Sequence, residues 1–154
     1  MRMFSVIAGL MVVMSCSSNL DDTFNSEVLV SSKLEKVYIN TLNWGLTDDN
    51  QLSAISSNVD KLRKRSDTLG TVKGLEPFIY TFKTDTLSLY FDGEITYQVQ
   101  DHFKTIHIKY IVLNKKEYRE LRTKAYNNEE GYHSVPKRPT QVGLPADMPK
   151  PPSN

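Results

Sequence analysis

The sequence predicts a mainly β fold, built as a single antiparallel meander of about six strands in a curled sheet or small sandwich. Three observations carry this prediction. Short runs in the middle of the chain alternate apolar and polar residues with the period of two that half-buried strands show. Turn-forming residues separate these runs. One later stretch has helical periodicity, which adds a single C-terminal helix, and a Pro-rich tail follows it.

The first predicted hairpin joins residues 37–44 to residues 52–57, and the first of these runs is rich in β-branched and aromatic residues. Its apolar positions change parity between Ile39 and Leu42, which indicates either a bulge or a strand buried on both faces. Upstream of this hairpin, residues 28–30 form a candidate short edge strand.

Two aromatic residues of the first hairpin, Tyr38 and Trp44, share a parity that differs from that of Val37 and Ile39. One of the two sets therefore points away from the main core. Outward aromatic side chains either form a binding surface for carbohydrate or protein or fill a second core layer. We favour the second core layer, because large aromatic residues are buried more often than not.

The clearest alternation lies in residues 78–91, where a two-residue turn at Thr84 and Asp85 brings the apolar positions of two strands onto one face. The predicted pairs are Phe82 with Leu87, Tyr80 with Leu89 and Phe78 with Phe91. Residues 94–99 alternate in the same way and are predicted as the next strand. A three-residue loop over 92–94 keeps its apolar set on the shared face, which places Gly93 at or beside a positive-φ position.

Residues 105–113 are predicted to close the meander. Their inward positions are Ile106, Ile108, Tyr110 and Val112, and their solvent-facing positions are Thr105, His107 and Lys109. A helix then begins after Asn114, because Asn114 and Glu117 fit a capping box. The helix ends at residues 127–128. Its apolar stripe is narrow, so it is expected to cover an edge or an open face of the sheet. The stripe consists of Tyr118, Leu121 and Ala125.

The N-terminal residues have the pattern of an export signal. Arg2 is the only charged residue before Cys16, and residues 3–14 are almost wholly apolar. This run of roughly a dozen residues is shorter than the ~20 that a membrane-spanning helix needs. It ends in an order that resembles the lipobox of bacterial lipoproteins, namely Val13, Met14, Ser15 and Cys16.

The resemblance implies cleavage before Cys16 by lipoprotein signal peptidase and acylation of that cysteine with fatty acids such as palmitate. Several acyl chains on one residue give stable attachment to a membrane. Ser17 follows the cysteine, which in the Gram-negative pattern directs a lipoprotein to the outer membrane, at its periplasmic or surface face. The body resembles small uncharacterised lipoproteins of the Gram-negative envelope through residues 37–57 and 78–91.

These observations divide the chain into four predicted parts. They are a signal peptide over 1–15, the lipidated cysteine and a flexible tether over 16–33, a β-rich domain with a C-terminal helix over 34–128, and a Pro-rich disordered tail over 129–154. Loss of Arg2 with the signal peptide leaves 18 basic against 18 acidic residues. Nucleic acid is therefore not an expected partner, because proteins that bind it usually carry a basic excess. The basic run at 61–65 lies in a long polar connection over 58–74 and is read as a solvated, mobile loop.

No catalytic signature stands out from the sequence. Motifs for serine nucleophiles and phosphate loops are absent, so no catalytic residue is assigned. The three histidines, His102, His107 and His133, lack the spacing of known metal motifs, and the only cysteine is assigned to the anchor. Neither a metal nor another cofactor is predicted. Two tripeptides, at 67–69 and 85–87, resemble the Asp-Ser/Thr-aliphatic acceptor for O-glycosylation in one group of Gram-negative bacteria, which makes Thr68 and Thr86 candidate acceptors.

Three functions are consistent with these features. The first is a lipid-anchored, non-enzymatic envelope protein that binds a protein or a glycan or has a structural role. The second is a hydrolase that acts on an envelope polymer, and the third is a periplasmic inhibitor or immunity-type protein. A concave pocket in which His102 converges with Asp or Glu side chains would favour the hydrolase.

Overall fold

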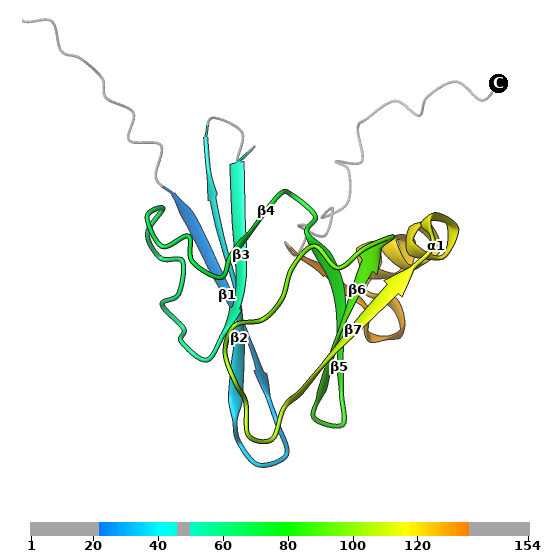
Figure 1. The fold of residues 1–154 in the computed structure, drawn as a ribbon, viewed down its shortest axis with the longest axis horizontal. Helices are drawn as coiled ribbons and strands as arrows, with labels where there is room; N and C mark the ends of the chain where they lie inside the picture. The colour runs from blue at the N-terminus through cyan, green and yellow to red at the C-terminus, as the bar shows by residue number, and fades with distance from the viewer. Residues whose placement is uncertain (1–21, 46–49, 136–154) are drawn as a thin grey trace, which may run out of the picture.

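The computed structural model describes residues 22–45 and 50–135. In this part of the chain two four-stranded sheets lie side by side, and α1 (Lys115–Tyr126) lies beyond the second sheet (Figure 1). The prediction of a mainly β fold with one C-terminal helix is confirmed. The prediction of a single, curled sheet is wrong, because the strands divide between two sheets and neither sheet closes.

The first sheet is an antiparallel meander in the order β1-β2-β3-β4. Its strands are β1 (Thr23–Val30), β2 (Lys36–Trp44), β3 (Asn50–Ser56) and β4 (Val72–Lys73). The predicted hairpin of β2 and β3 is confirmed, with a register that continues without a bulge. The parity change in β2 comes from burial on both faces, because residues 39–42 are all buried.

The second sheet has the order β7-β6-β5-β8. Its strands are β5 (Phe78–Lys83), β6 (Thr86–Asp92), β7 (His107–Leu113) and β8 (His133–Val135). The β5–β6 hairpin has the predicted register, with Phe82 opposite Leu87 and a turn whose two central residues both have positive φ. The closing strand β7 pairs with β6 in parallel, so this sheet is not the predicted antiparallel meander.

The parallel pairing follows from residues 94–99, which form no strand. Parallel neighbours need a long crossover, and residues 93–106 supply it. Gly93 has the predicted positive φ of 76° at the start of this crossover. Within it, Tyr97 is buried and stacks on Phe78, with ring centroids 5.6 Å apart. The alternating apolar residues of this segment therefore help to fill the core between the sheets, although Ile95 stays exposed.

The inner core is shared by the two sheets. It combines buried residues of the first sheet, such as Ile39 and Ile55, with buried residues of the second, such as Tyr80 and Leu89. Of the positions predicted to face inward on the last strand, Ile106 is buried, whereas Val112 is 47% exposed. Val112 lies near the end of β7, whereas Ile108 and Tyr110 of the same strand pack against the inner core.

An outer core covers the opposite face of the first sheet. It consists of Leu42, Leu52, Ala54 and Leu62, with Phe24 and Trp44 packed against it. Trp44 therefore belongs to a second core layer, as expected. The Arg65 guanidinium lies 5.5 Å from its ring centroid, a distance typical of a cation–π contact.

The helix α1 begins as predicted. Asn114 is its N-cap and forms a complete capping box with Glu117, and Asn127 is its C-cap. Ala125 is the buried residue of α1, which packs against the second sheet on the side away from the first (Figure 1). Among the described residues, no helix is long and apolar enough to cross a membrane.

Two predicted boundaries need correction. The tether was expected to run to residue 33, but β1 already begins at Thr23 and is longer than the predicted edge strand. The tail was expected to begin at residue 129, but Glu129–Gly131 forms a 3-10 turn and β8 pairs with β5. Pairing with neighbouring strands explains both differences, since it orders polar sequences that have little local preference. Residues 1–21 and 136–154, with the predicted signal peptide, lipobox and most of the tail, lie outside the described residues.

Two carboxylates join the sheets at one end of the molecule. Glu35, in the β1–β2 turn, accepts hydrogen bonds from the backbone N–H groups of residues 104–106 and from the Thr105 hydroxyl. Asp85, in the β5–β6 turn, accepts hydrogen bonds from the backbone N–H and the hydroxyl of Ser32. Thr105 was expected to face water, but this network half-buries it.

Candidate pocket between the two sheets

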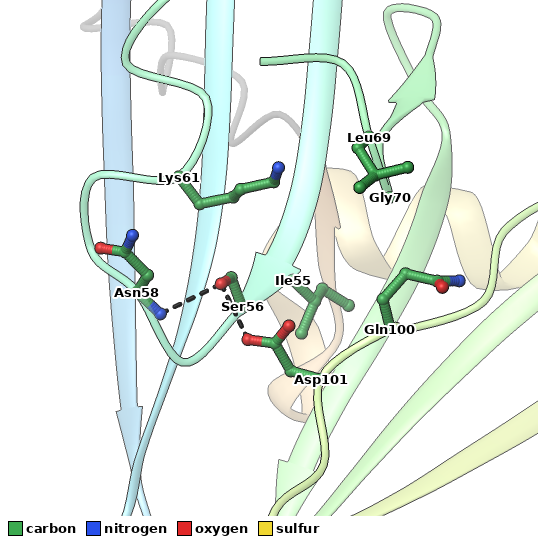
Figure 2. A pocket seen from close by; sticks show the side chains of 8 residues that line it. All are labelled: Ile55, Ser56, Asn58, Lys61, Leu69, Gly70, Gln100 and Asp101. Carbon is green, nitrogen blue, oxygen red and sulfur yellow. Dashed lines mark hydrogen bonds between the residues drawn. The ribbon is translucent and has the colours of Figure 1, made fainter.

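A pocket of about 340 Å³ opens where the end of β3, the connection after it and the crossover meet. Its size lies at the lower end of the ~300–1,000 Å³ that is typical of small-molecule sites. Figure 2 shows its lining, which is Ile55, Ser56, Asn58, Lys61, Leu69, Gly70, Gln100 and Asp101. The residues come from two segments that lie far apart in the sequence.

Tyr97 joins these segments beneath the pocket. Its hydroxyl accepts a hydrogen bond from the Ile55 N–H at 2.8 Å and donates one to the Gly70 carbonyl at 3.3 Å. Burial raises the pKa of Tyr97 to about 12, so the hydroxyl stays protonated and keeps both bonds. Gly70 has a φ of +67°, and a Cβ there would lie 2.8 Å from Cγ of Gln100, so a glycine is favoured at this point.

Asp101 is the anionic group of the pocket. One of its oxygens, Oδ2, accepts hydrogen bonds from Ser56 Oγ at 2.9 Å, from the Ser57 N–H at 2.6 Å and from Ser57 Oγ at 2.7 Å. Burial alone would raise the pKa of Asp101, but these three bonds and the nearby charge of Lys61 lower it below its usual value. Asp101 is therefore a carboxylate at neutral pH.

Lys61 is the cationic group of the pocket, and it forms an ion pair with Asp67. The Leu62 N–H donates to the other oxygen of Asp67 at 2.8 Å. This N–H and the Lys61 ammonium lower the pKa of Asp67. The loop that was predicted to be mobile is thus fixed by a local network. It places Lys61 at the pocket (Figure 2). The carboxylate of Asp67 compensates the charge of Lys61 there.

Asn40 holds the same loop against the first sheet and was missed in the sequence. It is fully buried, and its Nδ2 donates to the carbonyls of Asn58 at 3.0 Å and Lys61 at 2.9 Å. Its Oδ1 accepts from Ser26 Oγ at 2.6 Å. The available signal was an amide in the middle of a strand whose pattern allows burial on both faces, because a buried amide is normally hydrogen-bonded.

The structure does not bring the histidines into the pocket. His102 follows Asp101 directly but is exposed and is not a lining residue, and His107 is exposed on β7. His133 packs against the ring of Tyr80, with centroids 5.2 Å apart. In the described part of the chain, no group of three or more His, Cys, Asp or Glu side chains is placed to hold a metal ion.

The candidate modification sites differ in accessibility. Thr68 is exposed in the loop beside the pocket, and Thr86 is half-buried at the start of β6. Thr68 is therefore the more accessible acceptor, as expected from its loop position. The predicted lipidation site Cys16 and the lipobox residues Val13 and Ser15 lie outside the described residues.

The pocket combines several kinds of binding group. The carboxylate of Asp101, the amides of Asn58 and Gln100 and the backbone at Gly70 offer hydrogen-bond acceptors and donors, while Ile55 and Leu69 offer apolar surface. The hydroxyls of Ser56 and Ser57 already donate to Asp101, and its low pKa makes it a poor base for activating them.

Comparison with known proteins finds no matching family model, no matching curated protein and no matching solved structure.

Proposed function

We propose that the chain is a lipid-anchored protein of the outer membrane that acts as a non-enzymatic binding module. The pocket beside Asp101 carries the binding part of this proposal, and the lipobox carries the anchor. A hydroxyl-rich ligand such as a glycan fits the pocket best, because carboxylate and amide side chains pair with hydroxyl groups and Leu69 supplies apolar contact. The compensated charge of Lys61 also argues for a neutral ligand over an anionic one.

The anchor is tested by Cys16→Ser. The variant is expected to lose labelling by a fatty-acid analogue and to move from the membrane fraction to the soluble fraction, because the acylated cysteine is the proposed attachment. Ser17→Ala is the matched control and is expected to remain labelled. Continued labelling of Cys16→Ser with unchanged fractionation would contradict the lipoprotein assignment.

The pocket is tested by titrating the Cys16→Ser protein with neutral oligosaccharides, among them chitotriose and maltotriose, while its backbone amides are followed by NMR. At least one oligosaccharide is expected to shift the amides of Ser57, Gly70 and Asp101 selectively. Asp101→Asn is expected to weaken binding by roughly 10-fold to 100-fold, because a hydrogen bond to a charged group contributes about 1.5–3 kcal/mol. Shifts that are absent, or that cluster away from the pocket, would contradict the assignment.

Two further variants separate binding from folding. Asp101 also holds Ser56 and Ser57 in place, so Asp101→Asn changes both the local structure and the binding groups. Gln100→Ala is the second variant, because it removes an exposed side chain that lines the pocket. Gln100→Ala is expected to weaken binding by about 2-fold to 10-fold, the range for one neutral hydrogen bond. Gln98→Ala is the control, because Gln98 is exposed two residues away and does not line the pocket. Equal effects of Gln98→Ala and Gln100→Ala would argue against this pocket.

A further inference from the structure

Within the part of the chain that the structure describes, the outer edge of β1 is a strand edge with little protection. β1 is eight residues long, and five of these residues are exposed. Among the described residues, no strand pairs with this edge. Natural edge strands are usually protected by charged side chains, prolines, bulges or short length. β1 has no proline and no lysine, it pairs with β2 in an unbroken register, and Glu27 is its only charged residue.

Two of the exposed residues of β1 are apolar. Val28 is 48% exposed and Val30 is 43% exposed, and both lie on the face of the first sheet that carries the outer core. The loop after β3 covers only the other end of this face, where the Arg63 guanidinium lies 4.6 Å from the ring centroid of Phe24. A strand added at this edge would find both free backbone groups and an apolar strip.

The sequence of β1 is suited to pairing with itself. In an antiparallel pair with two-fold symmetry, directly opposed residues share a face, so the axis must pass through a residue and not between two residues. The two axes that pair most of the strand pass through Ser26 or Glu27. The axis at Glu27 places two carboxylates opposite each other, which is unfavourable. The axis at Ser26 instead places Val28 opposite the partner's Phe24 and Glu27 opposite the partner's Asn25.

We propose that two copies of this chain dimerise through β1, antiparallel about Ser26, so that the two first sheets join into one continuous eight-stranded sheet. A strand pair of this length buries less area than the ~1,200 Å² of a stable standard interface, so the dimer is weak in free solution. Confinement to a membrane by the proposed lipid anchor raises the local concentration and favours pairing. The effect of membrane confinement rests on the proposed function, because it needs the lipid anchor. The pairing of the two β1 strands does not.

The dimer is tested in solution with Cys16→Ser/Ser26→Cys, which has a single thiol because Cys16 is the only cysteine of the chain. At the proposed axis the two Cβ atoms lie about 4.5–5.5 Å apart, close to the spacing of a disulfide. Mild oxidation at about 1 mM protein is expected to give roughly tenfold more disulfide-linked dimer than Cys16→Ser/Asn25→Cys. Asn25 is equally exposed, but its two copies lie diagonally about 7–8 Å apart in this register.

A second measurement leaves Ser26 unchanged, because Ser26 also donates to Asn40. Sedimentation of the Cys16→Ser protein over a concentration series is expected to show a monomer–dimer equilibrium. Val28→Lys is expected to abolish it, since the ammonium would lie beside the partner's Phe24, whose ring the Arg63 guanidinium already covers. Val30→Lys is expected to keep it, since that lysine would face the carboxylate of the partner's Asp22. A monomer at all concentrations, or equal crosslinking at positions 25 and 26, would overturn the proposal. Because these proteins lack the anchor and need no glycan, neither result depends on the proposed function.

Discussion

Leu62→Ala is expected to lower the free energy of unfolding by about 2–5 kcal/mol, the usual cost of truncating a fully buried leucine. Leu62 has no exposed surface and packs with Leu42, Leu52 and Ala54 of the first sheet. It is the only residue of the connection between β3 and β4 that enters the outer core as the structure describes it. The cavity left by the alanine cannot close easily, because rigid strands form its other wall. Urea unfolding followed by tryptophan fluorescence measures the loss, since Trp44 borders the same core.

Leu69→Ala is the matched control for Leu62→Ala. It makes the same chemical change in the same loop, but Leu69 is 84% exposed, so its effect on stability is expected to stay within about 0.5 kcal/mol. The two variants also separate folding from binding. Leu69 lines the pocket and Leu62 does not, so Leu69→Ala is expected to weaken oligosaccharide binding at unchanged stability. Equal losses of stability in both variants would show that the loop is not held by Leu62.

Local patterns were sufficient for the parts of the fold that local interactions decide. The β5–β6 hairpin was predicted to its register because a two-residue turn and strict alternation leave few alternatives. The start of α1 was predicted because the Asn114–Glu117 capping box is a local signal. The parallel pairing of β6 with β7 was not predicted, since alternation in residues 94–99 is compatible both with a strand and with a crossover whose apolar residues turn inward.

The candidate pocket could not be predicted from local sequence patterns either. Its lining joins the loop after β3 to the crossover, and only the tertiary fold brings Ser56 to Asp101. The polar connection was recognised from its composition, but composition does not reveal that Asn40 and Leu62 fix it to the sheet. The basic run was read as a solvated loop, which fits the exposure of Arg63 and Arg65 but not the ion pair of Lys61 with Asp67.

Glu35→Gln is expected to destabilise the protein strongly at neutral pH and much less in acid. The Thr105 hydroxyl is the largest contribution to lowering the pKa of Glu35 to about 2, and the backbone N–H groups of residues 104–106 add to it. A carboxyl group whose pKa is lower in the folded state stabilises that state above its unfolded value, which is about 4.5. This contribution disappears as the pH falls from about 4.5 to about 2. A glutamine at this position has one acceptor oxygen and an NH₂ group that faces donors, so it cannot replace the carboxylate.

The difference in unfolding free energy between the native protein and Glu35→Gln should therefore stay constant from pH 7 down to about pH 5 and shrink from there to pH 2.5 in urea titrations. Glu94→Gln is the control, because Glu94 is exposed at the start of the crossover, so its effect on stability is expected to be small. Other carboxylates, such as Asp85, also have a lowered pKa, so the native protein alone would not isolate Glu35. A constant difference between native protein and Glu35→Gln would mean that shape, not charge, holds the β1–β2 turn to the crossover. A difference that shrinks in acid would show that the charge of Glu35 holds the β1–β2 turn to residues 104–106 of the crossover.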